Sequence, residues 1–167
     1  MNQLSRLDPL RTSDGAPNPD RRPRVLVAED DREMRRLVVE ALAQDGYDVA
    51  EVRDGVELLA QVGSSVLFGG FGSVREPPDL IVTDVRMPGL TGLTVLEGLR
   101  RAGGAVPVVV ITAFGDDETH RVARENGAVA VFDKPFDLDD LRTIVLHALR
   151  GPGSPRASVA NTRDAPR

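Results

Sequence analysis

The sequence predicts an α/β fold with a five-stranded parallel sheet and helices on both of its faces. Short apolar runs of strand length alternate five times with longer segments whose apolar residues recur at helical spacing. The runs are continuously apolar, as in Leu80-Ile81-Val82, which is typical of strands covered on both faces. Such alternation favours right-handed crossovers, and the ligand site of such a sheet lies beyond the carboxyl ends of its strands.

The first two strand–helix units occupy the N-terminal half of the chain. Residues 25–28 read Val-Leu-Val-Ala and predict a buried strand, and residues 31–44 predict a helix that ends before Gly46. Residues 47–52 predict a weaker strand, and residues 54–62 a short helix. The apolar positions expected to face the core are Met34, Leu37, Val38, Ala41 and Leu42 in the first helix and Val56, Leu58, Leu59 and Val62 in the second.

The other three units follow in the same rhythm. They comprise strands at residues 80–83, 106–111 and 128–132 and helices at residues 91–102, 116–126 and 137–149. Gly127 stands where a left-handed C-terminal cap is expected, and Asp137 is the expected N-cap of the last helix. The apolar positions expected to face inward in that helix are Leu138, Leu141, Ile144, Val145 and Leu149.

Three segments fall outside this pattern. Residues 1–23 and 150–167 are rich in Pro and Arg and lack apolar periodicity, so we expect disordered tails on either side of one domain over residues 24–149. Residues 63–78 contain four Gly and two Pro and are longer than an ordinary connection, so we expect a loop insertion there. A surface loop is the main interpretation. The alternative is a hydrophobic flap that docks a partner, because the segment also contains Val, Leu and Phe.

Composition and charge exclude several kinds of site. The chain has no Cys and two His, which rules out disulfides, zinc thiolate sites, iron–sulfur clusters and thiol nucleophiles, and leaves little for an imidazole metal site. Residues 25–149 contain 22 acidic and 12 basic residues, and an acidic body argues against binding to nucleic acid. The sequence has neither a signal-peptide pattern nor an apolar run of membrane-spanning length. We therefore expect a cytoplasmic protein that does not bind membranes.

Acidic side chains follow two of the predicted strands. Glu29, Asp30 and Asp31 come after the first strand, and Asp84 directly follows the third. Because the ends of adjacent parallel strands are neighbours, one or two of the first three carboxylates would face Asp84 and repel it unless a cation or a proton intervenes. A divalent metal ion is the simplest solution. A few oxygen ligands supplemented by water suit Mg²⁺. For Asp31 the favoured interpretation is instead a helix cap.

Two further polar residues stand at strand ends. Thr112 follows the fourth strand and brings a hydroxyl group toward the same crevice. Lys134 follows the fifth strand and is the only lysine in a chain that otherwise uses arginine. A compact ammonium group pairs with a carboxylate or phosphoryl oxygen as a point charge, which a guanidinium fork does not reproduce. Pro135 restricts Lys134 to an extended conformation, and the bond between them is either cis or trans.

Together these motifs resemble the receiver domain of two-component response regulators. The resemblance covers residues 24–149, and the segments that carry it are 25–31, 84–92, 112–113 and 134–136. It implies a flavodoxin-like, doubly wound (βα)5 fold. It also implies that Asp84 is the phosphoacceptor and that Thr112 and Lys134 contact the phosphoryl group. The implied Mg²⁺ ligands are Glu29, Asp30, Asp84 and the main-chain carbonyl of Arg86.

The chain departs from the family pattern three residues before the lysine. The family usually carries Tyr or Phe there, with a ring that moves inward with the switch Thr, whereas this chain has Val131. Phe132 is adjacent, but strand alternation points it to the other face. The departure leaves the phosphotransfer chemistry intact and calls the usual coupling of Thr112 to an aromatic ring into question. Phe114 stands where side chains in the family influence the access of water to the acyl phosphate.

The resemblance implies a signalling domain rather than an enzyme, one that promotes only its own phosphotransfer and dephosphorylation. A sensor histidine kinase or a histidine phosphotransfer protein would supply the phosphoryl group, with Mg²⁺ as cofactor. The segment after the last helix is too short for an output domain, so we expect a single-domain regulator with a separate effector protein.

Three other functions are alternatives to this one. The main alternative is a receiver-like docking module that acts without phosphorylation. An aspartyl phosphatase is disfavoured because Arg86 stands where a second acid is expected. A flavin module is disfavoured because acids, rather than a phosphate-binding loop, follow the first strand.

Overall fold

The computed structural model describes residues 21–67, 77–113 and 115–151. Five parallel strands form one sheet in the order β2-β1-β3-β4-β5. The strands are β1 (Arg24–Ala28), β2 (Asp48–Val52), β3 (Leu80–Asp84), β4 (Val108–Thr112) and β5 (Ala130–Asp133). The helices are α1 (Arg32–Gln44), α2 (Gly55–Leu67), α3 (Gly92–Arg101), α4 (Asp117–Glu125) and α5 (Leu138–Arg150). Strands and helices alternate along the chain, which confirms the predicted α/β fold.

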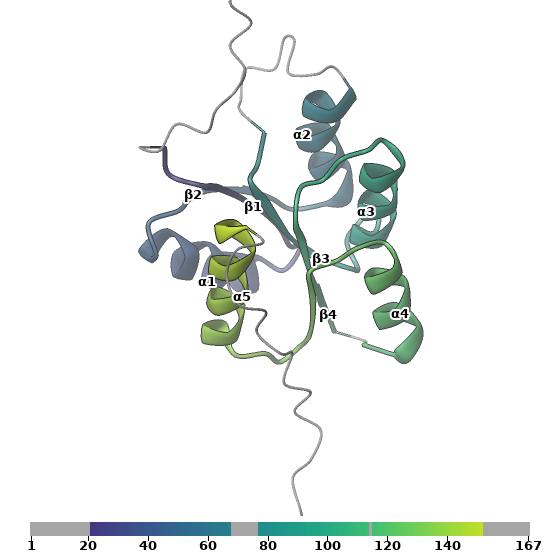
Figure 1. Ribbon diagram of the computed structural model, residues 1–167. Helices are drawn as coiled ribbons and strands as arrows, with labels where there is room; N and C mark the ends of the chain where they lie inside the picture. The colour runs from purple at the N-terminus through teal and green to yellow at the C-terminus, as the bar shows by residue number, and fades with distance from the viewer. Residues whose placement is uncertain (1–20, 68–76, 114, 152–167) are drawn as a thin grey trace, which may run out of the picture.

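The helices cover both faces of the sheet. Figure 1 shows α1 and α5 together on one face and α2, α3 and α4 on the other. Because both faces are covered, every residue of β3 and β4 is buried, as the apolar runs that begin these strands predict. Strand order reverses between β1 and β3, so the crevice at the carboxyl ends of these two strands is the expected ligand site.

The core has two apolar layers, one on each side of the sheet. The layer under α1 and α5 includes Val27, Val38 and Leu141. The layer under α2, α3 and α4 includes Leu58 and Leu96. Neighbouring residues of one strand contribute to opposite layers, so the sheet is packed against apolar side chains on both faces.

Polar caps fix where the helices begin. The side chains of Asp31, Thr91 and Asp116 each accept a hydrogen bond from a backbone N–H of the helix that follows. Asp137 does the same for α5, which confirms its predicted role. Gly127, after α4, has a φ of +74°, so the predicted left-handed cap is also confirmed.

The structure corrects the predictions for two helices. Leu37 is 50% exposed, and Val56 and Leu59 are 56% and 42% exposed, so these three side chains do not face the core as predicted. A helix that packs on a sheet buries only one side of its surface. The apolar stripes predicted for α1 and α2 are wider than the side that the sheet buries. Helix α2 also continues to Leu67, so the predicted loop insertion at 63–78 does not begin at residue 63. Residues 68–76 of that insertion lie outside the described residues.

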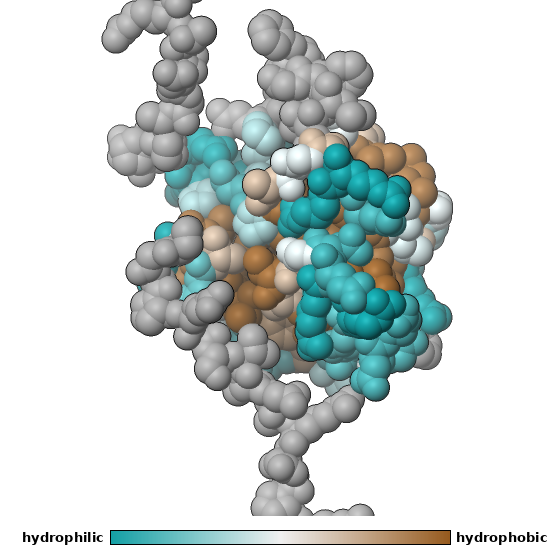
Figure 2. All heavy atoms as spheres, turned by 45° about the vertical axis from the view of Figure 1, so that its right-hand side comes forward, coloured by the Kyte–Doolittle hydropathy of each residue, from teal (hydrophilic) through white to brown (hydrophobic). Residues whose placement is uncertain are grey.

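The outer surface of α3 and α4 is largely polar. Figure 2 turns this side toward the viewer and shows mostly hydrophilic side chains over these helices. On α4, Arg121 forms ion pairs with Glu118 and Glu125, one turn away on either side. Within the described residues, none of the helices has the length and apolar character needed to cross a membrane.

Candidate functional site

The sheet brings the acidic residues of the sequence to one place. Ala28 of β1 is the register partner of Thr83 of β3, so the next residues, Glu29 and Asp84, emerge side by side. Glu29 is 2% exposed and Asp84 is 4% exposed. Two carboxylates buried next to each other repel unless a positive charge compensates them.

Asp84 is held in a fixed orientation at the end of β3. Its Oδ1 atom accepts a hydrogen bond of 3.0 Å from the backbone N–H of Arg86, and its Oδ2 atom lies 2.6 Å from Nζ of Lys134. The main chain around Asp84 is packed against the first turn of α3. A Cβ atom on Gly92 would overlap the main-chain oxygen of Asp84 and lie 2.6 Å from the hydroxyl of Thr83, so only glycine fits at this position.

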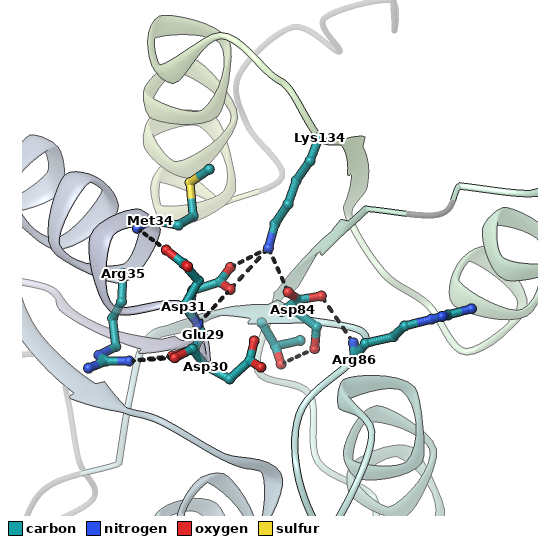
Figure 3. Close-up of polar contacts among 9 residues, drawn as sticks. Glu29, Asp30, Asp31, Met34, Arg35, Asp84, Arg86 and Lys134 are labelled. Atoms are coloured by element: carbon teal, nitrogen blue, oxygen red, sulfur yellow. Dashed lines mark hydrogen bonds and ion pairs between the residues drawn. The ribbon is translucent and has the colours of Figure 1, made fainter.

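Lys134 compensates both buried carboxylates. Figure 3 shows its side chain reaching from the end of β5 to Glu29 and Asp84. Its Nζ atom lies 3.0 and 2.8 Å from the two carboxylate oxygens of Glu29. Burial lowers the pKa of Lys134, but hydrogen bonds and charge from Asp84 and Glu29 outweigh that effect and raise it. The charged form of Lys134 is therefore favoured at this site. The peptide bond between Lys134 and Pro135 is cis.

One ammonium group cannot neutralise all the acids that converge here. Glu29, Asp30 and Asp84 each place one carboxylate oxygen within 4.8 Å of the others, and Asp30 is exposed to solvent. Burial is the main cause that raises the pKa of Glu29 to about 7, and the charge of Asp84 adds to it, against the opposing effect of Lys134. The site therefore has an excess of negative charge that favours a cation.

The arrangement of the three carboxylates fits a small divalent cation. Opposite corners of an octahedron with metal–oxygen bonds of about 2.1 Å are about 4.2 Å apart, so small side-chain rotations bring the three oxygens around one Mg²⁺. The exposure of Asp30 leaves room for water ligands. Arg86 follows two residues after Asp84, and Figure 3 shows its side chain extending away from the carboxylates. The guanidinium group of Arg86 therefore does not lie between the three carboxylates, where the cation would bind.

Asp31 and Arg35 hold the chain segment that carries Glu29 and Asp30, the acid pair after β1. Asp31 accepts a hydrogen bond of 2.7 Å from the N–H of Met34, which confirms the interpretation of Asp31 as a cap. The guanidinium group of Arg35 donates to the main-chain oxygen of Glu29 at 2.7 Å and is anchored by Glu51 on β2 at 3.2 Å. Sequence reasoning did not identify Arg35, because only the folded chain brings it to a carbonyl group six residues earlier.

Thr112 lies at the end of β4, beside the same crevice. It is 1% exposed, and its main-chain oxygen accepts a hydrogen bond of 2.7 Å from the N–H of Lys134. Thr112 is the register partner of Asp133, which precedes Lys134. The three strand ends that carry Asp84, Thr112 and Lys134 are thus adjacent in the sheet, and the structure gathers the residues that the sequence analysis singled out.

Comparison with known proteins identifies the family to which this arrangement belongs. Residues 25–146 match the family model of the response regulator receiver domain. The chain is a member of this family. Sporulation initiation phosphotransferase F of Bacillus subtilis is 28% identical over 122 residues, which cover 73% of this chain and 90% of that protein.

Other relatives are longer than the region that matches this chain. Response regulator MprA of Mycobacterium leprae is 38% identical over 128 residues, and the match covers 76% of this chain but only 51% of MprA.

Among solved structures, the receiver domain of the Francisella response regulator 1452 superposes with a TM-score of 0.67 at 27% identity, covering 77% of this chain and 97% of that one. The chemotaxis response regulator CheY4 of Vibrio cholerae superposes with a TM-score of 0.61 at 25% identity, covering 77% of this chain and 99% of that one. The predicted flavodoxin-like topology and family are both confirmed.

In this receiver domain Val131, which replaces the usual Tyr or Phe, and its neighbour Phe132 face opposite sides of the sheet. Val131 packs against the apolar layer under α2, α3 and α4, whereas Phe132 packs in the layer under α1 and α5. The ring of Phe132 lies 5.7 Å from that of Phe136, between their centroids. Phe132 therefore does not supply the ring that Val131 lacks. Phe114 lies outside the described residues.

Proposed function

We propose that this receiver domain accepts a phosphoryl group on Asp84 from the phosphohistidine of a partner protein. The observation that carries the proposal is the buried carboxylate of Asp84, bound to Lys134 on one oxygen and flanked by the acid pair. A carboxylate oxygen of Asp84 forms the new bond to phosphorus while the bond between phosphorus and the imidazole nitrogen breaks. The released imidazole then takes a proton, and the product is an aspartyl phosphate.

The surrounding residues supply positioning and charge compensation, which is most of what phosphoryl transfer requires. Lys134 holds the acceptor carboxylate and is close enough to bind a phosphoryl oxygen. Thr112 provides a hydroxyl group at the neighbouring strand end. Mg²⁺, held by Glu29, Asp30, Asp84 and the main-chain carbonyl of Arg86, would neutralise charge on the phosphoryl oxygens. The backbone N–H of Arg86 fixes the acceptor carboxylate through its other oxygen.

The phosphorylated domain then acts on a protein partner. A new dianion beside Thr112 attracts that residue and the chain that follows β4, which shifts the surface formed by α4, β5 and α5 between two states. A sensor histidine kinase or a histidine phosphotransfer protein supplies the phosphoryl group, and an effector protein reads the surface. The acidic body of the domain favours a protein over nucleic acid as that target.

Labelling with radioactive acetyl phosphate tests the proposal. We expect the protein to incorporate one phosphoryl group in the presence of Mg²⁺ and none in EDTA. Asp84→Asn should abolish the label, whereas the matched control Asp31→Asn, which changes only the cap of α1, should retain it. Unchanged labelling of Asp84→Asn would refute the assignment of the acceptor. Absence of label from the wild type, with a phosphorylated kinase as well as with acetyl phosphate, would favour a docking module that acts without phosphorylation.

A further inference from the structure

A polar contact joins the first turn of α4 to the end of β5. The Nε2 atom of His120 lies 2.8 Å from Oδ1 of Asp133. Because an ionised carboxylate only accepts, the imidazole N–H donates this hydrogen bond. The side chain of His120 is 18% exposed and that of Asp133 is 50% exposed. Because half of the Asp133 side chain is exposed to solvent, the pair adds little to the stability of the fold.

The end of β5 connects this contact to the proposed phosphorylation site. Asp133 and Lys134 are consecutive, and strand alternation sends their side chains in opposite directions. Lys134 reaches the carboxylates of Glu29 and Asp84, whereas Asp133 reaches α4. The same strand end is tied to β4 by the hydrogen bond from the N–H of Lys134 to Thr112.

The chain that leaves β4 lies directly on the pair. A Cβ atom on Gly115 would overlap the carboxylate of Asp133 and lie 2.7 Å from Nε2 of His120. The main chain at Gly115 therefore contacts both partners and leaves no room for a side chain. Thr112 is only three residues earlier, so a movement of Thr112 toward Asp84 displaces this main chain relative to the pair.

We propose that His120 and Asp133 are positioning residues that transmit the state of Asp84 to the surface formed by α4 and β5. This inference rests on the proposed function. Val131, on the same face of β5 as Asp133, has no ring that could swing inward with Thr112. The close contact of Gly115 with His120 and Asp133 provides a polar route instead, from the end of β4 to the first turn of α4.

Amide chemical shifts of the ¹⁵N-labelled protein test the route, with beryllofluoride and Mg²⁺ standing in for the phosphoryl group. The amide of Arg86 reports on the acceptor site, since it donates to Asp84, and the amide of Ala123 reports on α4. In the wild type we expect both to shift. In His120→Ala and in Asp133→Ala the Arg86 shift should persist while the Ala123 shift is lost.

Two further variants separate the proposed role from a general effect of mutation on α4. Asp133→Asn keeps an acceptor for the imidazole N–H and should restore the response at Ala123. Glu118→Ala, on the same helix but paired with Arg121, should leave it unchanged. If Ala123 responds in both alanine variants as in the wild type, the inference is wrong while the proposed function stands. If Arg86 does not respond in the wild type, the proposed function fails and the inference fails with it.

Discussion

The crowding of carboxylates predicts how the stability of this domain depends on pH. The pKa of Glu29 is raised from its ordinary value of 4.5 to about 7, chiefly by burial and further by the charge of Asp84. The folded protein therefore binds a proton at Glu29 more tightly than the unfolded chain does. The stability that this proton confers is complete below pH 4.5 and is lost as the pH rises through about 7.

The expected magnitude follows from the same values. One unit of pKa corresponds to about 1.4 kcal/mol, so a shift from 4.5 to about 7 amounts to about 3 kcal/mol in the free energy of unfolding. We expect the wild type to lose this much more stability than Glu29→Gln between pH 4.5 and pH 8 in Mg²⁺-free buffer. The comparison concerns the change with pH, because the variant also loses the ion pair with Lys134.

Urea unfolding followed by far-ultraviolet circular dichroism at several pH values measures this difference. Glu125→Gln is the matched control, since Glu125 is an exposed partner of Arg121 on α4. Addition of Mg²⁺ at pH 8 should stabilise the wild type more than Glu29→Gln, because the cation binds the folded acid cluster. Parallel pH profiles for the wild type and Glu29→Gln would refute the electrostatic reasoning.

Three further predictions concern the residues around the acceptor. Lys134→Arg should preserve the fold and lower the rate of labelling by acetyl phosphate, because a guanidinium fork does not reproduce the contacts of a compact ammonium ion; a wild-type rate would contradict this. Gly92→Ala should lower the free energy of unfolding by about 1–3 kcal/mol, measured in urea, since its methyl group overlaps the main chain of Asp84; an unaltered midpoint would show that the loop yields freely. Arg35→Gln should weaken Mg²⁺ binding, measured by calorimetry without a phosphoryl donor, because the carbonyl group of Glu29 loses its hydrogen bond from Arg35. Equal Mg²⁺ affinity in the variant and the wild type would exclude a positioning role for Arg35.

The fold and the candidate site depend on different kinds of information in the sequence. The apolar runs of β3 and β4 predict buried strands because every position is covered, and parallel connectivity then places Glu29 next to Asp84. The same reasoning fails for Leu37 and Leu59, since helical spacing identifies an apolar stripe but not how much of it the sheet covers. It also fails for the end of α2, because Gly63 weakens a helix without ending it.

Contacts made by individual side chains beyond the regular elements could not be predicted from the sequence. The bond from Arg35 to the carbonyl group of Glu29 and the pair of His120 with Asp133 depend on side-chain direction at element ends, which carries no periodic signal. Lys134, in contrast, could be identified from the sequence, because it is the only lysine and its chemistry differs from that of the arginines elsewhere in the chain.

The central claim is that the acids after β1 and β3 gather around one Mg²⁺ so that Asp84 can accept a phosphoryl group. A crystal structure of the protein with Mg²⁺ and beryllofluoride tests it most directly. We expect the beryllofluoride group on a carboxylate oxygen of Asp84 and the Mg²⁺ ion in contact with Glu29, Asp30, Asp84 and the carbonyl oxygen of Arg86. The amine of Lys134 should donate a hydrogen bond to a fluorine atom. An adduct at another residue, or an ion bound away from this acid cluster, would contradict the account.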